Sequence, residues 1–433
     1  MTGGTLRGFR DYPPPDAGAR SEIRRRMRAA ARLAGFVELE LPSVEPLDLY
    51  TAKSGEEIVH QLFAFRDKGG RDVALTPETT PSLARIYAER AKAEPLPVKW
   101  FTISRLWRYE EPQSGRSREF SQFNLDLLGV PGEEGDAEVL ATASAALDAA
   151  GAEGLYAFRL NDRALAESIG RARGAHDADR FFHAVDRFRK ARPEEFRDDL
   201  IASGLSGGGA RELEEFFRST GTGIGPRDAE AFFDRVGALG LDDAGRAGVE
   251  RLRRLLRLLG SLGIADRVRL DPTVVRGLAY YTSSVYEAFA TTGDSRALFG
   301  GGRYDHLIER SGGPPTPACG LAIGDQTLEN LLRENDRWPE GEPPLDTYVI
   351  AVREEDRAEA LRWVAFLRGR GKSADSDPLG RSFPRQLKEA ARRRARRAWI
   401  VGLKEAAPHA VVERDLSTGA QREFPPSEAE RSA

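Results

Sequence analysis

The sequence predicts an α+β fold in which an antiparallel sheet is flanked by helices, interrupted by a helical insertion and followed by a separate α/β domain. Over residues 1–161, strand and helix patterns do not alternate strictly, which favours antiparallel pairing. Strand patterns vanish in the predicted insertion, residues 162–262, and return over residues 263–336. A Pro- and Gly-rich linker at 337–346 precedes the last predicted domain, residues 347–433.

The composition is typical of a soluble globular protein. Of the 433 residues, 40% are hydrophobic and 31% are charged. No run approaches the roughly 18 to 20 apolar residues of a membrane span, and the start "MTGGTLRGFRDYPPPD" lacks the apolar core of a signal peptide. We therefore expect a cytoplasmic protein with no membrane partner.

Cysteine and histidine usage argues against a metal centre built from these residues. Cys319 is the only cysteine, so intrachain disulfides and cysteine-rich zinc sites are excluded. The histidines lie far apart in sequence, without helical or zinc-finger spacing; they are His60, His176, His183, His306 and His409. The net charge of −3 argues against indiscriminate nucleic-acid binding, but it allows a local basic surface.

The elements of the first part follow from apolar spacing. A helix is predicted where apolar residues recur every three or four positions, with Gly35 as a stop and arginines on the other side; the apolar positions are Ile23, Met27, Ala30 and Ala34. Strand patterns follow in "FVELELP" and in "LFAFRDKGGRDVALT", where the Gly pair indicates a hairpin. The helix pattern "TTPSLARIYAERA" precedes two further strands, "VKWFTISRLWRYEE" and "FSQFNLDLLG".

Helical periodicity dominates the insertion, for example in "LGLDDAGRAGVERLRRLLRLLGSLG", where we expect leucines in the core and arginines in solvent. Strand patterns return in "RVRLDPTVVRGLAYYTSSVYEAFA" and "PACGLAIG". The last domain contains the continuous apolar strands "TYVIAV" and "AWIVGL", which are typical of a parallel sheet, and Trp399 is expected in its core.

The stretch "RYEEPQSGRSREFSQFNLDLLG" at 108–129 carries polar residues at alternate positions of two strand-like runs. Alternation alone favours an amphipathic hairpin with its polar face in water. The residue types also suit a nucleotide. Arg108 can pair with an α-phosphate, Glu110 can accept from an adenine amino group, Phe120 can stack on the base, and Arg116 can reach the terminal phosphates.

This arrangement resembles motif 2 of class II aminoacyl-tRNA synthetases, and further motifs resemble those of the histidyl-tRNA synthetase family along nearly the whole chain. They are "RGFRD" at 7–11, "LTPETTPSLAR", "VVRGLAYYTSSVYE" and "GGGRYDHLI". The triple glycine of the last motif would by itself indicate a turn. The resemblance implies a class II antiparallel sheet, with a C-terminal anticodon-binding domain.

The resemblance also implies roles for single residues. Glu78 and Thr80 would bind the α-amino group of histidine, with Gln122 beside them. Asp126 and Tyr281 would hold the two imidazole nitrogens, and Tyr280 would line the pocket. Arg276 would contact the α-phosphate and the substrate carboxylate, where negative charge develops. Without the flanking "RGL", the two tyrosines would be interpreted as one buried and one exposed strand aromatic.

Three positions depart from the best-known bacterial pattern. Asp126 replaces a Glu, Ala279 replaces an Asp, and Thr327 in "GLAIGDQTLENLL" stands where motif 3 usually has an Arg. Both the alanine and the "GD" resemble a plant-organelle-like branch of the family. Charge neutralisation would then depend on Arg108, Arg116 and Arg276, together with Mg²⁺.

The function implied by the resemblance is ligation of histidine to tRNA(His), with ATP consumed to form histidyl-adenylate. The basic pattern "QLKEAARRRARR" is either an anticodon-loop contact or an ordinary solvated helix face. The segment "LPSVEP" resembles motif 1, which implies a homodimer. The alternative is a non-catalytic histidine sensor, such as the regulatory subunit of ATP phosphoribosyltransferase, which the missing motif 3 arginine favours slightly. The tRNA elements that are read, the residue compensating for Thr327 and the geometry of the insertion stay open.

Overall fold

A computed structural model of the protein describes residues 4–51, 60–276, 280–291, 297–341, 345–403 and 410–425. Contacts divide the chain into two compact units, Met1–Pro339 and Glu340–Ala433, and the division falls within the expected linker. None of the helices in the described part combines the length and apolar character needed to cross a membrane.

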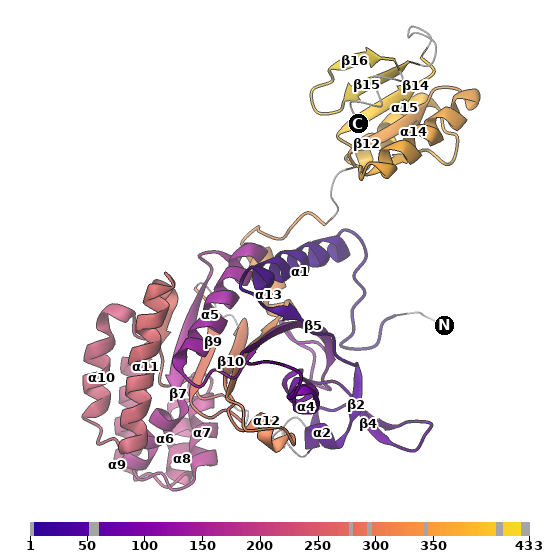
Figure 1. The fold of residues 1–433 in the computed structure, drawn as a ribbon. Coiled ribbons are helices and arrows are strands. Elements are labelled where there is room, and N and C mark those ends of the chain that lie inside the picture. Colours follow the sequence, from indigo (N-terminus) through magenta and orange to yellow (C-terminus); the bar gives the residue numbers. More distant parts are fainter. Residues whose placement is uncertain are drawn as a thin grey trace. The chain divides into compact units, whose positions relative to one another are not determined.

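The first unit is built on a large, mostly antiparallel sheet (Figure 1). Its strands, in order across the sheet, are β1 (Val37–Glu38), β5 (Val98–Trp107), β6 (Glu119–Leu128), β11 (Ala318–Gly324), β10 (Phe299–Arg303), β9 (Ser284–Ala290), β7 (Tyr156–Asp162) and β8 (Val268–Leu270). The predicted antiparallel sheet is therefore confirmed, with the difference that the edge pairs β1–β5 and β7–β8 are parallel. Parallel neighbours need a long crossover, and the helical insertion supplies the one between β7 and β8.

One face of this sheet is covered by helices and forms the core. The covering helices are α1 (Asp16–Leu33), α5 (Glu133–Leu147) and α13 (Asp325–Glu334). On β6, Phe123, Leu125 and Leu127 point into this core, as the alternation predicts. The opposite face therefore receives the polar residues Gln122 and Asn124.

The prediction that the arginines of α1 lie on its solvent side is wrong for one of them. Arg20 is buried, and it pairs with Asp325 and, over 3.0 Å, with Glu329, both on α13. The guanidinium also lies 3.8 Å from the ring centroid of Tyr12. Two carboxylates and an aromatic face compensate for its removal from water, which no local pattern in α1 reveals.

Smaller elements surround the second face of the sheet. A separate sheet has the order β2 (Val44–Pro46), β4 (Asp72–Leu75) and β3 (Ala64–Arg66), and the nearby helices are α2 (Asp48–Thr51), α4 (Thr80–Arg90) and α12 (Leu307–Arg310). The insertion helices gather beside β7 (Figure 1); they are α6 (Arg163–Ala172), α7 (Ala178–Arg187), α8 (Pro193–Ala202), α9 (Gly207–Ser219), α10 (Ala229–Gly237) and α11 (Asp243–Ser261). The leucines of α11 lie in the core, as expected.

Two local expectations differ from the structure. The strand β5 ends at Trp107, so Arg108 and Glu110 lie just beyond it rather than within it. The triple glycine does not form a turn, because residues 300–302 are central in strand β10.

The second unit has a five-strand order in its described residues: β13 (Ala374–Ser376), β12 (Thr347–Ala351), β14 (Arg397–Val401), β15 (Val411–Asp415) and β16 (Gln421–Phe424). The first three are parallel, as predicted, while β15 and β16 add an antiparallel hairpin that the sequence reading missed. The helices α14 (Arg357–Gly369) and α15 (Phe383–Arg392) pack on separate apolar clusters of the sheet. Trp399 is buried, as expected, and donates to Glu413 over 2.9 Å.

Candidate active site

A cleft of about 1120 Å³ lies on the polar face of the large sheet. It is lined by all of the predicted site residues except Asp126, namely Glu78, Thr80, Arg108, Glu110, Arg116, Phe120, Gln122, Arg276, Tyr280 and Tyr281. These residues come from three separated stretches of the chain, 78–80, 108–122 and 276–281, and the fold brings them to one surface. An amphipathic hairpin whose polar face only contacts water would not require residues from separate stretches of the chain to come together.

Strand register builds the floor of the cleft from small residues. Asn124 of β6 lies opposite Ala322, Ala322 opposite Gly300, and Gly300 opposite Glu287. A Cβ atom at Gly300 would lie 2.1 Å from a guanidinium nitrogen of Arg276. The strand therefore needs glycine here because an arginine side chain lies directly on its backbone.

Arg276 lies in the middle of this floor. Its guanidinium pairs with Glu287 over 2.5 Å, and its backbone has a φ of 56°. The approach to Arg276 is anchored because the Asn161 side chain donates to the carbonyls of Pro272 and Val274. Burial acts to lower the pKa of Arg276, but the negative charge of Glu287 outweighs it and the pKa is raised. The side chain is thus a fixed cation.

At one end of the cleft, the predicted nucleotide-binding residues contact one another. Arg108 donates from Nε to the Pro77 carbonyl over 3.0 Å, and its guanidinium lies 5.5 Å from the centroid of Phe120. Arg116 pairs with Glu110 over 2.9 Å. Two cations, a carboxylate and an aromatic ring thus share one wall, an arrangement that suits a phosphorylated base.

At the other end, Glu78, Tyr280 and Tyr281 are buried, while Thr80 and Gln122 are partly exposed. Tyr280 lies 3.4 Å from a carboxylate oxygen of Glu78, and Thr80 opens helix α4 beside them. The rings of Tyr280 and Tyr281 are 5.0 Å apart, centroid to centroid. Both tyrosines are buried, so the interpretation as one buried and one exposed strand aromatic is wrong. Burial raises the pKa of both hydroxyls, which therefore stay protonated as donors.

Asp126 lies below this pocket instead of on its lining. It sits opposite Gly320, where a Cβ atom would come within 2.4 Å of its Oδ1. Tyr304 donates to Oδ1 over 2.5 Å, while Oδ2 is buried with no hydrogen-bond partner. Burial raises the pKa of Asp126 to about 7, against the opposing effect of the Tyr304 hydrogen bond.

Several other buried polar atoms at the cleft also have no hydrogen-bond partner within the described residues. They are Thr79 Oγ1, Asn124 Oδ1, Arg276 Nε and Asp325 Oδ1. Native proteins rarely leave such atoms unpaired, because each costs roughly 1–3 kcal/mol. Their concentration along one cleft indicates groups that a ligand would satisfy.

Sequence reasoning missed three residues of this site. Glu287 partners Arg276, Tyr304 contacts Asp126, and Arg159 lines the far wall beside Glu287. Glu287 and Tyr304 lie inside the motifs "VVRGLAYYTSSVYE" and "GGGRYDHLI", so the motifs could have indicated both as site residues. Arg159 stands in none of the quoted motifs.

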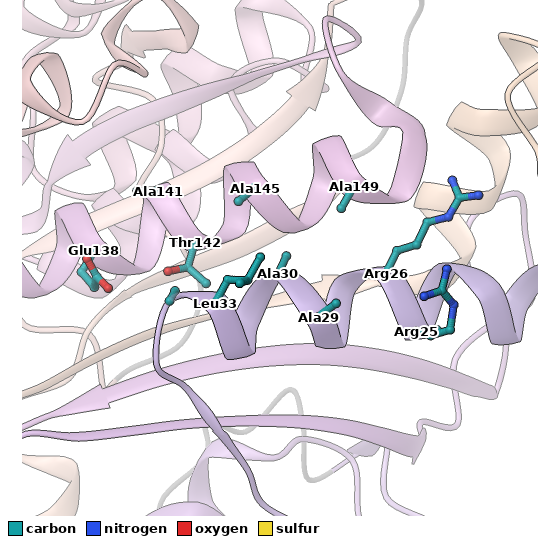
Figure 2. A pocket seen from close by; sticks show the side chains of 11 residues that line it. Arg25, Arg26, Ala29, Ala30, Leu33, Glu138, Ala141, Thr142, Ala145 and Ala149 are labelled. Carbon is teal, nitrogen blue, oxygen red and sulfur yellow. The ribbon is translucent and has the colours of Figure 1, made fainter.

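A second hollow of the first unit differs from the cleft in its chemistry. The groove between α1 and α5 has a volume of about 580 Å³ and is lined largely by alanines with Leu33 (Figure 2). Its charged groups, Arg25, Arg26 and Glu138, lie at the rim among those apolar side chains. Among the described residues, His, Cys, Asp and Glu do not gather in groups of three or more that could hold a metal ion.

The chain is similar to known proteins over nearly its whole length. A family model described as histidyl-tRNA synthetase matches residues 8–328. The histidine–tRNA ligase of Halobacterium salinarum is 40% identical over 423 residues, which cover 97% of this chain and 95% of that protein. The chain belongs to the histidyl-tRNA synthetase family.

Solved structures share the fold of this histidyl-tRNA synthetase family member. The histidyl-tRNA synthetase from Nostoc sp. PCC 7120 matches with a TM-score of 0.85 at 21% identity, covering 100% of this chain and 99% of that chain. A protein from Bacillus halodurans, described as an ATP phosphoribosyltransferase regulatory subunit/histidyl-tRNA synthetase, matches with a TM-score of 0.73 at 21% identity, covering 90% and 96%.

Thr327, which the sequence predicts at the arginine position of motif 3, lies at the cleft in this structure. Thr327 is in the first turn of α13 and lines the cleft, and its hydroxyl bonds to the Gly324 carbonyl over 3.3 Å. This side chain is too short to replace an arginine. Ala279, the other departure near Arg276, lies outside the described residues.

Proposed function

We propose that this protein is a histidine–tRNA ligase that activates histidine with ATP to histidyl-adenylate and transfers it to the 3′ end of tRNA(His). The observation that carries the proposal is the single cleft that holds Arg108 and Arg276 together with a buried tyrosine pocket. Membership of the histidyl-tRNA synthetase family and 40% identity to a histidine–tRNA ligase over nearly the whole chain support it.

Adenylate formation needs charge stabilisation rather than proton transfer. The substrate carboxylate is already an anion when it attacks the α-phosphate, so no general base is required. Arg276 and Arg108 would contact the phosphate oxygens on which negative charge increases. Arg276 is paired with Glu287 in the structure, and this pair would orient the guanidinium over Gly300 before the substrate arrives.

Histidine would be selected by the buried end of the cleft. The Glu78 carboxylate would accept from the α-ammonium group, with Thr80 and Gln122 beside it. The unpartnered Oδ2 of Asp126, which lies below the pocket lining, would accept one imidazole N–H through a bridging water, and Tyr281 would bond to the other ring nitrogen. Tyr304 would hold Asp126 in place.

ATP would occupy the open end as its Mg²⁺ complex. Phe120 would stack on adenine, Glu110 would accept from its amino group, and Arg116 would reach the terminal phosphates. The described residues supply no cluster of carboxylates for Mg²⁺. The ion would therefore enter bound to the nucleotide's phosphates, as is usual for Mg²⁺.

The second unit would bind the anticodon loop. Much of its basic segment is already paired with acids: Arg392 with Glu389 and Arg393 with Asp375. Arg385 and Lys388 of α15 lie outside every ion pair that the structure shows among the described residues. These two cations would make the salt-sensitive phosphate contacts.

We infer a homodimer in the cytoplasm, where tRNA is charged. The motif 1 segment includes β2, and the neighbouring edge strand β1 exposes 64% of Val37. An exposed apolar residue on an unpaired sheet edge is suited to contact a second copy of the chain. Sedimentation at micromolar concentration would measure the oligomeric state.

The decisive experiment is histidine-dependent exchange between ATP and pyrophosphate, followed by charging of total tRNA with labelled histidine. A ligase performs both reactions. A histidine sensor of the ATP phosphoribosyltransferase type, which Thr327 favours slightly, would bind histidine without either reaction. That result would overturn the proposed function.

A further inference from the structure

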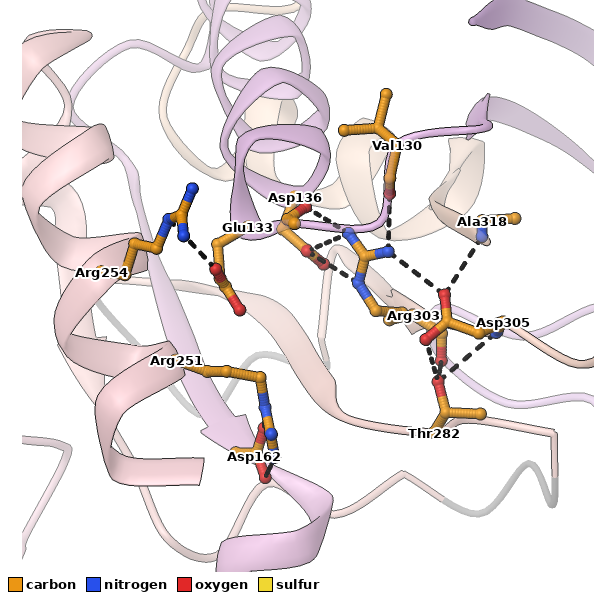
Figure 3. A network of polar contacts seen from close by, with 11 residues as sticks. Val130, Glu133, Asp136, Asp162, Arg251, Arg254, Thr282, Arg303, Asp305 and Ala318 are labelled. Atoms are coloured by element: carbon orange, nitrogen blue, oxygen red, sulfur yellow. Dashed lines mark hydrogen bonds and ion pairs between the residues drawn. The ribbon is translucent and has the colours of Figure 1, made fainter. Parts of the chain in front are cut away.

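A partly buried polar network joins the two segments that carry the pocket tyrosines (Figure 3). Thr282 directly follows Tyr281, while Arg303 and Asp305 stand on either side of Tyr304. The Thr282 backbone N–H donates to the Arg303 carbonyl over 2.8 Å. The Thr282 hydroxyl donates to Asp305 Oδ2 over 3.1 Å. The two tyrosine segments are thus fixed to each other by short contacts.

The guanidinium of Arg303 anchors this network to helix α5. It donates to Asp136 over 2.6 Å, to the Val130 carbonyl over 2.9 Å, to the Gly132 carbonyl over 2.7 Å and to Asp305 over 3.2 Å. Arg303 is only 4% exposed, and each of its three guanidinium nitrogens is used. It therefore has no donor left for a substrate, and its contacts act within the protein.

Asp305 extends the network to the floor of the pocket. Its Oδ1 accepts from the backbone N–H of Ala318, the first residue of β11, over 3.2 Å. Two residues further along β11 is Gly320, which lies opposite Asp126. The Asp305 carboxylate thus contacts Thr282, Arg303 and strand β11, which runs beside the buried Asp126.

We propose that Thr282, Arg303 and Asp305 form a clamp of positioning residues that sets the separation of Tyr281 and Tyr304 and thereby the selectivity for the imidazole ring. This clamp rests on the proposed function, since it presumes that histidine occupies the tyrosine pocket. A site built from fixed donors and acceptors discriminates among rings only while those groups hold their positions.

The test uses Thr282 because its hydroxyl can be removed without changing its volume. Thr282→Val removes the hydroxyl contacts to Asp305 and to the Arg303 carbonyl, and Thr282→Ser retains them. Thr291→Val deletes a hydroxyl just beyond the solvent end of β9 as a control. Calorimetry of the full-length protein measures the Kd for histidine and for the triazole analogue of histidine. Exchange kinetics measures the KM for ATP.

We expect Thr282→Val to raise the Kd for histidine about 10-fold, as for the loss of one positioning hydrogen bond. The ratio of the Kd for the triazole analogue to the Kd for histidine should become smaller. Thr282→Ser and Thr291→Val stay within about twofold of the parent protein, and the KM for ATP is unchanged. Equal weakening of histidine and ATP, or a Thr282→Val protein that matches Thr291→Val, would overturn the clamp.

Asp305→Asn provides a second variant of the same size, in case Thr282→Val does not fold. It removes the charge that Arg303 faces, and the same selective loss of histidine binding is expected. Because calorimetry requires no catalysis, a parent protein that binds histidine but lacks exchange would defeat the proposed function and leave this test intact.

Discussion

The two ends of the cleft differ in how they are prepared for their ligands. At the nucleotide end, Arg116 exposes 50% of its side chain and pairs with Glu110 in contact with water. At the amino-acid end, Asp126 and Tyr304 are 1% and 2% exposed and bond to each other. The buried end is therefore fixed before binding, whereas the open end must exchange its own ion pair for contacts to ATP.

The largest expected effect comes from removing the cation between these two ends. Arg276→Ala should lower the rate of ATP–pyrophosphate exchange by about 10² to 10³-fold, because a preorganised charge at the reacting phosphate is lost. Circular dichroism and thermal melting check that folding is retained. Near-normal exchange in a folded variant would remove Arg276 from the mechanism.

The next effect tests the buried end through Asp126→Asn. An amide retains the shape but loses the anionic acceptor, so the Kd for histidine should rise about 100-fold while ATP binding is kept. Calorimetry with each ligand measures both. An unchanged histidine Kd would show that the ring does not bond to this carboxylate.

The same variant should be more stable than the parent protein at pH 8. Burial raises the pKa of Asp126 from its ordinary 3.8 to about 7, so the folded state prefers the proton. The stability that this group contributes is present below about pH 4 and is lost as the pH rises through about 7. The stabilisation by Asp126→Asn should be on the order of 2–4 kcal/mol at pH 8 and vanish near pH 4. Denaturant unfolding at both pH values measures it.

At the open end, Arg116→Ala should have a smaller effect. We expect a rise of about 5-fold in the KM for ATP and no change in the Kd for histidine, because an exposed, screened cation contributes little. The effect should shrink as salt increases. A comparable loss of histidine binding would contradict the separation of the two ends.

The smallest effect concerns the second unit. Arg385→Ala combined with Lys388→Ala should raise the KM for tRNA several-fold and flatten its salt dependence, with exchange unchanged. Titration of aminoacylation against tRNA at two salt concentrations measures this. If the salt dependence is unaltered, α15 is an ordinary solvated helix.

The sequence allowed good prediction where local periodicity decides structure. Alternation on β6 placed Gln122 opposite the core, and apolar spacing located α1. The sequence could not show that Asp126 lies opposite Gly320, or that Glu287 pairs with Arg276 above Gly300. Both contacts depend on the register between strands that are far apart in sequence. Arg20 was misplaced for the same reason, since its partners lie on α13.

Strands β7 and β8 run side by side in the same direction, and the whole helical insertion connects them. A tight turn cannot replace that connection. Because β8 runs parallel to β7, the chain must cross back to the edge of the sheet at which β7 begins before β8 can start. A shortened engineered synthetase could lose most of these helices, but it would still require a return segment of a dozen residues or more. What the insertion carries can thus vary, provided that a connection of that length remains between β7 and β8.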